Sequence, residues 1–197
     1  MSRYESEAKL GYFATPDTMT DKIVKRLLFK GPARLWDPCC GEGVALRHVQ
    51  DNVPETSRSY GFEIDKGRAQ AAAMVLDEVV PSAFEHARID PASMQLLWLN
   101  PPYDNRAGQG SDSTRLELWF LRNTSKYVVP NGVLVFIVPR YTLTKEMVNA
   151  LENRYTNLAV YRFDDAEFQA YQQVVVFGTR REKGLDSHAA GAAPAEG

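Results

Sequence analysis

The residues best suited to chemistry stand together at Leu96–Tyr103, which reads Leu-Leu-Trp-Leu-Asn-Pro-Pro-Tyr. The apolar run has the length and composition of a buried strand, and it ends at Asn100. Pro101 and Pro102 then prevent a helix from starting, because each proline fixes φ and lacks an N–H. The stretch therefore predicts a rigid, extended elbow that presents an amide side chain and a backbone carbonyl, with the ring of Tyr103 just beyond.

These groups suit a substrate that carries an amino group on a flat ring. Such an amino group is a poor nucleophile, because its lone pair is delocalised into the ring. The Asn100 side-chain oxygen and the Pro101 carbonyl could hold both amino hydrogens and draw the nitrogen toward a tetrahedral geometry. The freed lone pair would then attack a methyl group in line, so positioning and preorganised acceptors would supply the catalysis. Tyr103 would stack on the base, which must leave its duplex to reach the elbow.

A second candidate site is the loop Asp37–Gly43, which reads Asp-Pro-Cys-Cys-Gly-Glu-Gly. Gly41 and Gly43 allow a tight turn and close approach of a nucleotide to the backbone. A dinucleotide fingerprint would need a third glycine where this chain has a leucine, and the carboxylates of Asp37 and Glu42 have the wrong sign for a pyrophosphate. The loop instead suits a nucleoside with a cationic arm, such as S-adenosylmethionine. The alternative is an ordinary strand–turn–helix connection.

Three further carboxylates follow predicted strands. Glu63 ends a strand about 20 residues after the glycines, where a carboxylate that binds both ribose hydroxyls is expected. Asp65 is close enough to compete for that role. Asp90 ends a weaker predicted strand, Phe84–Ile89, and could accept a hydrogen bond from an adenine amino group. An aspartate after a strand is more often a turn or cap residue, so both interpretations of Asp90 stay open.

Alternating strand and helix patterns position these motifs. Helices are predicted from an N-cap at Thr15 to about Gly31, and at Val44–Gln50, Gly67–Val80, Leu116–Val128 and Thr144–Tyr155. Strands are predicted at 34–36, Ser59–Ile64, Phe84–Ile89, Leu96–Leu99, Gly132–Val138, Leu158–Phe163 and Val174–Thr179, with a loop at Asn105–Ser113. The order predicts an α/β fold with a Rossmann-like, doubly wound, mostly parallel seven-stranded sheet and an antiparallel last strand. Ligands of such sheets bind beyond the carboxyl ends of the strands, where every motif above falls.

Length and composition fit one catalytic domain. The 197 residues are 44% hydrophobic and 24% charged, with no segment near the ~20 apolar residues that cross a bilayer. Met1–Leu10 lacks a signal-peptide core, and the adjacent Cys39 and Cys40 make no disulfide framework, so we expect a cytoplasmic protein without a membrane partner. The three histidines share no ligand-like spacing, and no metal site is expected. The expected domain covers residues 1–184, followed by a disordered tail at 185–197.

Taken together, these motifs resemble those of class I S-adenosylmethionine-dependent methyltransferases, specifically the adenine-N6 DNA methyltransferases with gamma-type motif order. Asp37–Gly43 is similar to the cofactor loop, Gly61–Asp65 to the ribose motif and Asn100–Tyr103 to the catalytic motif. Gly11–Pro16 resembles the segment that closes over the methionine end of the cofactor. The resemblance implies S-adenosylmethionine as cofactor and Phe168 as an aromatic residue against the flipped base. It implies cofactor contacts at Phe13, Thr15, Asp37, Cys39, Gly41, Gly43, Glu63, Ile64 and Asp90.

Two features depart from that family. The chain has no room for the usual target-recognition domain, and its net charge of −2 does not favour DNA. We therefore expect methylation of an adenine amino group in DNA, with sequence recognition supplied by a specificity partner or by a missing domain. Related Asn-Pro-Pro-Tyr enzymes methylate RNA bases or a glutamine amide of release factors, and both substrates stay open as alternatives. A non-catalytic, cofactor-binding subunit of a larger complex is the third interpretation.

Overall fold

A computed structural model describes residues 13–103, 115–164, 168 and 172–182 of the chain. The predicted tail at 185–197, the predicted loop at Asn105–Ser113 and the start of the Gly11–Pro16 segment lie outside these described residues. No helix in the described part is long and apolar enough to span a membrane.

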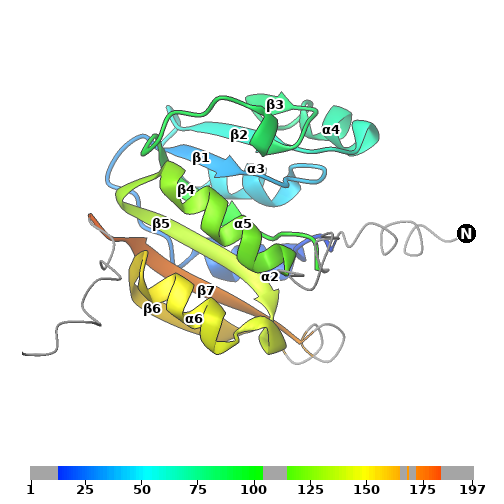
Figure 1. The fold of residues 1–197 in the computed structure, drawn as a ribbon. Coiled ribbons are helices and arrows are strands. Elements are labelled where there is room, and N and C mark those ends of the chain that lie inside the picture. Colours follow the sequence, from blue (N-terminus) through cyan, green and yellow to red (C-terminus); the bar gives the residue numbers. More distant parts are fainter. Residues whose placement is uncertain (1–12, 104–114, 165–167, 169–171, 183–197) are drawn as a thin grey trace, which may run out of the picture.

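Seven strands form a single sheet in the order β3-β2-β1-β4-β5-β7-β6 (Figure 1). The strands are β1 (Arg34–Asp37), β2 (Arg58–Phe62), β3 (Glu78–Val80), β4 (Met94–Leu99), β5 (Val128–Pro139), β6 (Tyr155–Arg162) and β7 (Gln173–Arg180). The helices in the described ranges are α2 (Asp17–Val24), α3 (Val44–Gln50), α4 (Lys66–Ala72), α5 (Leu116–Thr124) and α6 (Lys145–Glu152), with 3-10 turns η1 (Phe84–His86), η2 (Ser125–Tyr127) and η3 (Arg140–Thr142). Strands β1 to β5 pair in parallel, and β7 runs antiparallel to both β5 and β6. The predicted mostly parallel sheet with an antiparallel last strand is confirmed.

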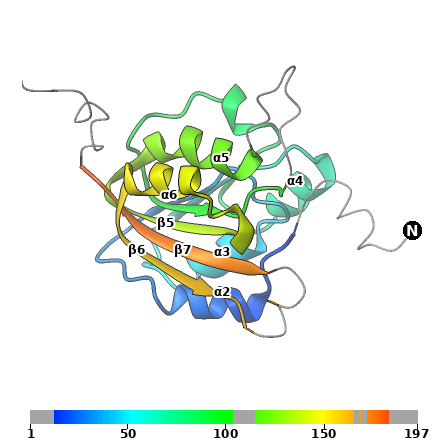
Figure 2. The same ribbon diagram turned by 60° about the horizontal axis from the view of Figure 1, so that its bottom comes forward.

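Helices cover both faces of the sheet. Figure 2 shows α5 and α6 on one side and α2 and α3 on the other. Alternate residues of β4 enter the two cores, with Leu97 and Leu99 facing α5 and α6, and Leu96 and Trp98 facing the opposite layer. Because both faces are buried, the central strands read as continuous apolar runs rather than alternating ones. That property made the strand before Asn100 recognisable.

The predicted third strand at Phe84–Ile89 is wrong. The strand β3 is Glu78–Val80, inside the segment predicted as the end of a helix, because α4 already stops at Ala72. The β-branched pair at the end of β3 extends the sheet beside β2. Phe84 begins the 3-10 turn η1 and is buried because its ring packs near Trp36, with ring centroids 6.0 Å apart. Its burial therefore comes from aromatic packing and not from a strand.

Three more helices end earlier than predicted. Helix α6 stops at Glu152, and the predicted last residue, Tyr155, begins β6 instead. Helix α2 stops at Val24. Helix α5 stops at Thr124, where the hydroxyls of Thr124 and Ser125 donate to carbonyls four residues earlier, at 2.7 and 2.6 Å. Such hydroxyl bonds compete with the helical pattern. Val128 pairs with Met94 instead, which makes β5 longer than predicted.

Asp77 fixes the turn between α4 and β3. Its carboxylate accepts hydrogen bonds from the Arg58 guanidinium (2.8 Å), the Ser59 N–H (2.8 Å), the Ser59 hydroxyl (3.1 Å) and the Gln50 amide (2.6 Å). Partial burial acts to raise the pKa of Asp77, but these donors outweigh it and lower the pKa to about 2. The ionised carboxylate therefore ties α3, β2 and β3 together.

We expect Asp77→Asn to lower the free energy of unfolding by about 1–2 kcal/mol at pH 7. Because the folded pKa lies below the unfolded value, the stabilisation is complete above about pH 4 and is lost as the pH falls toward 2. Urea unfolding at pH 7 and at pH 3 measures both effects, and the difference between variant and wild type should shrink at pH 3. Asp51→Asn, which removes only an exposed partner of Arg47, serves as the control. An equal loss at both pH values would contradict the assignment.

Candidate functional site

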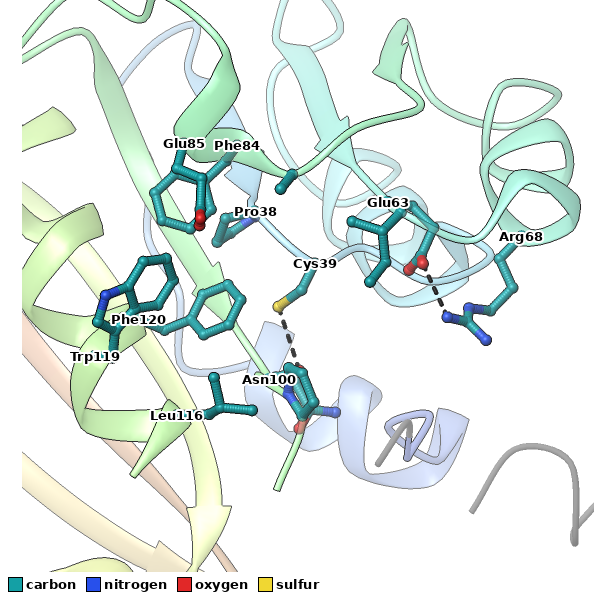
Figure 3. A pocket seen from close by; sticks show the side chains of 13 residues that line it. Pro38, Cys39, Glu63, Arg68, Phe84, Glu85, Asn100, Leu116, Trp119 and Phe120 are labelled. Atoms are coloured by element: carbon teal, nitrogen blue, oxygen red, sulfur yellow. Dashed lines mark hydrogen bonds and ion pairs between the residues drawn. The ribbon is translucent and has the colours of Figure 1, made fainter. Parts of the chain in front are cut away.

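The carboxyl ends of β1, β2 and β4 meet around two adjoining cavities. The first has a volume of about 280 Å³ and is lined by Pro38, Cys39, Glu63, Ile64, Arg68, Ala83, Phe84, Glu85, Asn100, Pro102, Leu116, Trp119 and Phe120 (Figure 3). The second has about 150 Å³ and is lined by Phe13, Ala14, Thr15, Asp17, Asp37, Cys39, Cys40, Glu42, Val44, Ala45, Trp98 and Asn100. The two cavities share Cys39 and Asn100, and the Cys39 thiol donates to the Asn100 carbonyl at 3.5 Å. The predicted elbow thus stands where the cavities join.

The glycine loop turns tightly between β1 and α3. Gly41 and Gly43 have φ of 57° and 80°, in the left-handed region that favours glycine. A Cβ at Gly43 would also come within 3.0 Å of the Leu76 side chain. The Gly41 N–H donates to Glu63 at 3.0 Å, so the loop is held against the end of β2.

Glu63, and not Asp65, lines the first cavity. Its side chain is 5% exposed and accepts hydrogen bonds from the N–H groups of Gly41 (3.0 Å) and Asp65 (2.8 Å) and from the Arg68 guanidinium (2.9 Å). Asp65 instead caps α4, because its carboxylate accepts from the Arg68 N–H at 2.9 Å, which lowers the pKa of Asp65. A carboxylate offers about four lone-pair sites, so Glu63 keeps capacity for a ligand hydroxyl.

Carboxylates concentrate in the second cavity. Asp37 is buried at the end of β1 and accepts from the Cys39 N–H at 2.9 Å. Burial raises the pKa of Asp37 to about 7, and the negative charge of Glu63 adds to the rise. Asp17 and Glu42 line the same cavity. A group with a positive charge would be stabilised here, and it would shift Asp37 to its ionised form.

We expect the affinity for S-adenosylmethionine to rise about tenfold between pH 6 and 7.5, because a cationic ligand favours the ionised form of Asp37. In the free protein the raised pKa keeps this acid largely neutral below pH 7, so binding must release a proton there. Isothermal titration in two buffers of different ionisation enthalpy measures the affinity and the proton release together. Asp37→Asn should bind more weakly at pH 7.5 and without this pH dependence. The same slope in wild type and variant would contradict the assignment.

Asn100 is held by hydrogen bonds at both ends of its amide. Its nitrogen donates to the Phe13 carbonyl (2.7 Å) and to the Thr15 hydroxyl (3.1 Å), and its oxygen accepts from the Tyr103 hydroxyl (2.7 Å). Thr15 was predicted to cap α2, but Pro16 stands at the N-cap without a side-chain bond. The segment before α2 is thereby tied to the elbow.

Tyr103 is not free to stack on a base in this structure. Its ring stacks on Phe13, with centroids 5.2 Å apart and an angle of 14° between the ring planes, and its hydroxyl donates to the Asn100 oxygen. Burial raises the pKa of this hydroxyl above its usual range, so Tyr103 stays neutral. The expected base-stacking role of Tyr103 would require the ring to leave Phe13.

An aromatic wall of the first cavity was missing from the predicted site. Phe84 of η1 lies 5.5 Å from the ring centroids of both Trp119 and Phe120 of α5. Figure 3 shows these rings gathered on the side of the cavity opposite Glu63 and Arg68. Flat apolar walls of this kind suit a purine ring. With the third strand placed at Glu78–Val80, Phe84 would have been expected just beyond the carboxyl end of that strand, where ligands bind.

The structure corrects the expected role of Asp90. Because no strand exists at Phe84–Ile89, Asp90 does not end one. It precedes β4, its carbonyl accepts from the Ser93 hydroxyl at 2.7 Å, and it shares a surface hollow with Arg34 and Met94, the first residues of β1 and β4. Asp90 therefore lies at the amino edge of the sheet, away from both cavities, and the acidic residue of this segment that lines the first cavity is Glu85.

The remaining expected residues fall on different sides of the site. Ile64 is exposed at the rim of the first cavity, Pro102 lines it and Pro101 is buried beside them. Phe168 belongs to neither cavity. Its ring packs against the hydrophobic clusters and lies 5.3 Å beneath the Arg162 guanidinium. Its contact with a flipped base stays a prediction.

Solved structures of low sequence identity share this fold. A Listeria monocytogenes protein described as a class I S-adenosylmethionine-dependent methyltransferase has a TM-score of 0.72 at 14% identity, covering 95% of this chain. The chain spans 65% of the length of that protein. An S-adenosylmethionine-dependent O-methyltransferase from Thermotoga maritima has a TM-score of 0.64 at 13% identity, covering 94% of this chain and 74% of its own. A tRNA methyltransferase from Aquifex aeolicus has a TM-score of 0.60 at 15% identity, covering 85% of this chain and 70% of its own.

No curated protein matches the sequence. A family model described as an uncharacterised methyltransferase family, DUF6094, matches residues 1–194. The two cavities fit the cofactor of such enzymes, because an aromatic wall and Glu63 suit an adenosine, and Asp17, Asp37 and Glu42 suit a cationic methionine end. The cofactor is S-adenosylmethionine, and the protein is an S-adenosylmethionine-dependent methyltransferase with the class I fold. The chain belongs to the methyltransferase family DUF6094.

Proposed function

We propose that this methyltransferase acts on nitrogen and methylates the exocyclic amino group of adenine in DNA. The observation that carries the proposal is the position of Asn100–Tyr103. The elbow follows β4 directly, and Asn100 lines both the cavity suited to adenosine and the cavity suited to the methionine end. An amide beside the reacting methyl group is the arrangement that amino-group methylation needs.

The residues of the elbow would position the amino group. The Asn100 oxygen has two lone pairs, of which the Tyr103 hydroxyl occupies one, so the second is available to an amino hydrogen. The Pro101 carbonyl would accept the other hydrogen, and both prolines keep the two acceptors at a fixed separation. The cofactor supplies an electrophilic methyl group on a sulfonium. Catalysis would then rest on prepositioned acceptors, with no base needed before transfer.

The cysteines of the glycine loop do not act as nucleophiles in this proposal. Burial raises the pKa of the Cys39 thiol well above its usual range, and the carboxylates of Asp37 and Glu63 raise it further. Cys40 is buried and its pKa is raised for the same reasons. Both therefore stay as thiols at neutral pH.

The choice of DNA rests on the motif order and on the segment at Phe13 and Thr15, which contacts the elbow directly. The net charge of −2 gives little general attraction to a polyanion, so we infer a specificity partner or a further recognition domain. RNA bases and glutamine amides present the same planar amino group to Asn100. Similarity of fold to a tRNA methyltransferase keeps RNA as the second substrate to test.

The test is mass spectrometry of nucleosides and peptides from cells that express wild type or Asn100→Ala. We expect N6-methyladenine to rise in DNA with wild type and to stay at background with the variant. A wild-type-dependent rise only in RNA nucleosides, or only in methylglutamine, would overturn the choice of DNA and retain N-methylation. Methylation of oxygen or carbon atoms would overturn both.

A further inference from the structure

A hydrogen-bonded chain reaches Asn100 from β7, which is separated from β4 by β5 in the sheet. The Gln173 side-chain amide donates to the Tyr103 hydroxyl at 2.5 Å, and that hydroxyl lies 2.7 Å from the Asn100 oxygen. Gln173 is the first residue of β7 and is 2% exposed. It lines neither of the two cavities. A buried polar side chain that contacts the elbow, and that no ligand-binding role explains, needs its own account.

The direction of each hydrogen bond follows from the groups that meet, because the Gln173 nitrogen faces Tyr103 and the Phe13 carbonyl faces the Asn100 nitrogen. The Gln173 nitrogen can only donate, so the Tyr103 oxygen must accept from it. The single proton of the hydroxyl is then left to donate to the Asn100 oxygen. At the other end of the Asn100 amide, the Phe13 carbonyl can only accept, so the nitrogen must face it. Both ends of the network therefore select one orientation of the Asn100 amide.

Backbone hydrogen bonds from neighbouring segments hold Gln173 in place. Its carbonyl accepts from the Phe163 N–H at 3.1 Å, and it pairs with Pro139 at the end of β5. The preceding residue, Gln172, has φ of 49° and accepts from the Arg140 N–H at 2.8 Å. Non-glycine residues rarely adopt this conformation, and surrounding contacts must enforce it. The donor to Tyr103 is thus held by β5, β6 and β7 together.

We propose that Gln173 is a positioning residue for methyl transfer, because its amide directs the Tyr103 proton to the Asn100 oxygen and reinforces the orientation that the Phe13 carbonyl selects. The inference rests on the proposed function of Asn100 as the acceptor for the amino group. Without the donor from Gln173, the Phe13 carbonyl alone opposes rotation of the Asn100 amide, so the Tyr103 hydroxyl can reverse and accept from a rotated fraction of that amide. The rotated amide would present a donor to the amino group, which needs an acceptor.

Two variants of Gln173 separate positioning from packing. Gln173→Met keeps the volume and removes the donor, so kcat should fall about fivefold, the worth of one hydrogen bond. Gln173→Glu keeps the shape, but its carboxylate accepts the Tyr103 proton and leaves two oxygens facing each other at Asn100. Its kcat should fall roughly 10- to 100-fold at pH 8, as expected when a buried polar group loses its partner. The KM for the cofactor should change less than about threefold in both variants.

The pH profile gives a result that a structural role would not produce. Once the carboxyl group introduced by Gln173→Glu is protonated, it is again a donor to Tyr103, so the activity of this variant relative to wild type should recover as the pH falls from about 8 to about 6. Burial raises the pKa of such a carboxyl into this range. Among the residues that the structure describes, the ionisable groups that act on Tyr103 are Glu117, Cys39 and Tyr141, and they are present in both proteins. Saturating cofactor in every assay removes the contribution of Asp37.

Gln95→Glu and Gln95→Met are matched controls, because Gln95 lies on β4 of the same sheet and bonds the Arg34 N–H away from the elbow. A double-mutant cycle adds a second test. Once Tyr103→Phe has removed the hydroxyl, Gln173→Met should cost no further activity. Losses that multiply in the double variant, or a Gln173→Glu defect that is equal at pH 6 and pH 8, would overturn the proposal.

A substrate-independent readout separates this proposal from the proposed function. The Asn100 side-chain amide resonances, assigned by their loss in Asn100→Ala, should shift in Gln173→Met and in Tyr103→Phe but not in the Gln95 variants. Unchanged resonances would refute the relay, that is, the orientation of the Asn100 amide by Gln173 through Tyr103. If Asn100→Ala leaves methylation intact while the resonances shift, the relay exists and the proposed function of Asn100 falls.

Discussion

Asn100→Ala is expected to reduce kcat for methyl transfer by on the order of 10²–10³-fold, the loss seen when one preorganised group is removed from a site of developing charge. Alanine removes the acceptor for the amino hydrogen and leaves the amino lone pair delocalised into the ring. The carboxylates that suit the cofactor, Asp37 and Glu63, are untouched. Single-turnover assays with saturating cofactor measure the chemical step, and calorimetry with S-adenosylmethionine checks that the affinity stays within about fivefold of wild type.

Thr15→Ala is the matched control for that result. It removes one acceptor of the Asn100 amide but keeps the Phe13 carbonyl, so we expect a loss of only about fivefold. Asn100→Asp should lose nearly as much as alanine, because its carboxylate would face the Phe13 carbonyl oxygen where the amide nitrogen now donates. A fall in cofactor affinity that matches the fall in kcat would contradict a role for Asn100 in the chemical step.

The sheet and its carboxyl edge were predictable because burial leaves a direct mark on the sequence. The strand Met94–Leu99 is buried on both faces and is followed by Asn100 and two prolines, so its existence and its end could be read locally, although it starts two residues before the predicted Leu96. The same holds for the glycine loop, whose positive φ values require glycine. These features depend on residues that are neighbours in the sequence. The elbow and the loop were therefore placed at the correct edge.

The third strand was not predictable in the same way. Glu78–Val80 has only three residues and follows an alanine-rich helix without a proline or glycine between them. Asp77 sets its start through donors from β2 and α3, which are distant in the sequence. The segment Phe84–Ile89 contains larger apolar residues, and the strand was therefore predicted there. Because the third strand was predicted at Phe84–Ile89, Asp90 was expected to follow its end and was assigned the adenine contact. For the same reason, Phe84 was not recognised as part of the aromatic wall.

Contacts to the elbow from distant segments were equally hidden. Thr15 has the residue type and position of an N-cap, and only the folded chain shows that its hydroxyl accepts from Asn100 instead. Gln173 lies 70 residues from Tyr103 in the sequence, and no local pattern links them. The sequence thus suggested which groups could react, whereas the contacts that orient those groups required the fold.

Glu63→Gln is expected to weaken the binding of S-adenosylmethionine about 100-fold, from the loss of charge-assisted hydrogen bonds worth about 1.5–3 kcal/mol each. The carboxylate now accepts from the Gly41 N–H, the Asp65 N–H and the Arg68 guanidinium while it lines the first cavity. The amide of glutamine has one acceptor oxygen, and its nitrogen must face one of these donors. The variant should therefore lose the contact to the ligand and hold the glycine loop less firmly, and calorimetry measures the change in affinity.

Asp65→Asn is the control, because Asp65 was the rival carboxylate in the sequence. It caps α4 through the Arg68 N–H, and an asparagine oxygen can accept that bond equally well. We therefore expect less than about a threefold change in cofactor affinity, since N-caps of asparagine and aspartate have similar worth. Equal losses of affinity in the two variants would mean that the combined negative charge of both carboxylates stabilises the bound cofactor, and that Glu63 makes no direct contact with the adenosine. A loss only in Glu63→Gln, with thermal stability close to wild type, would establish Glu63 as the direct ligand.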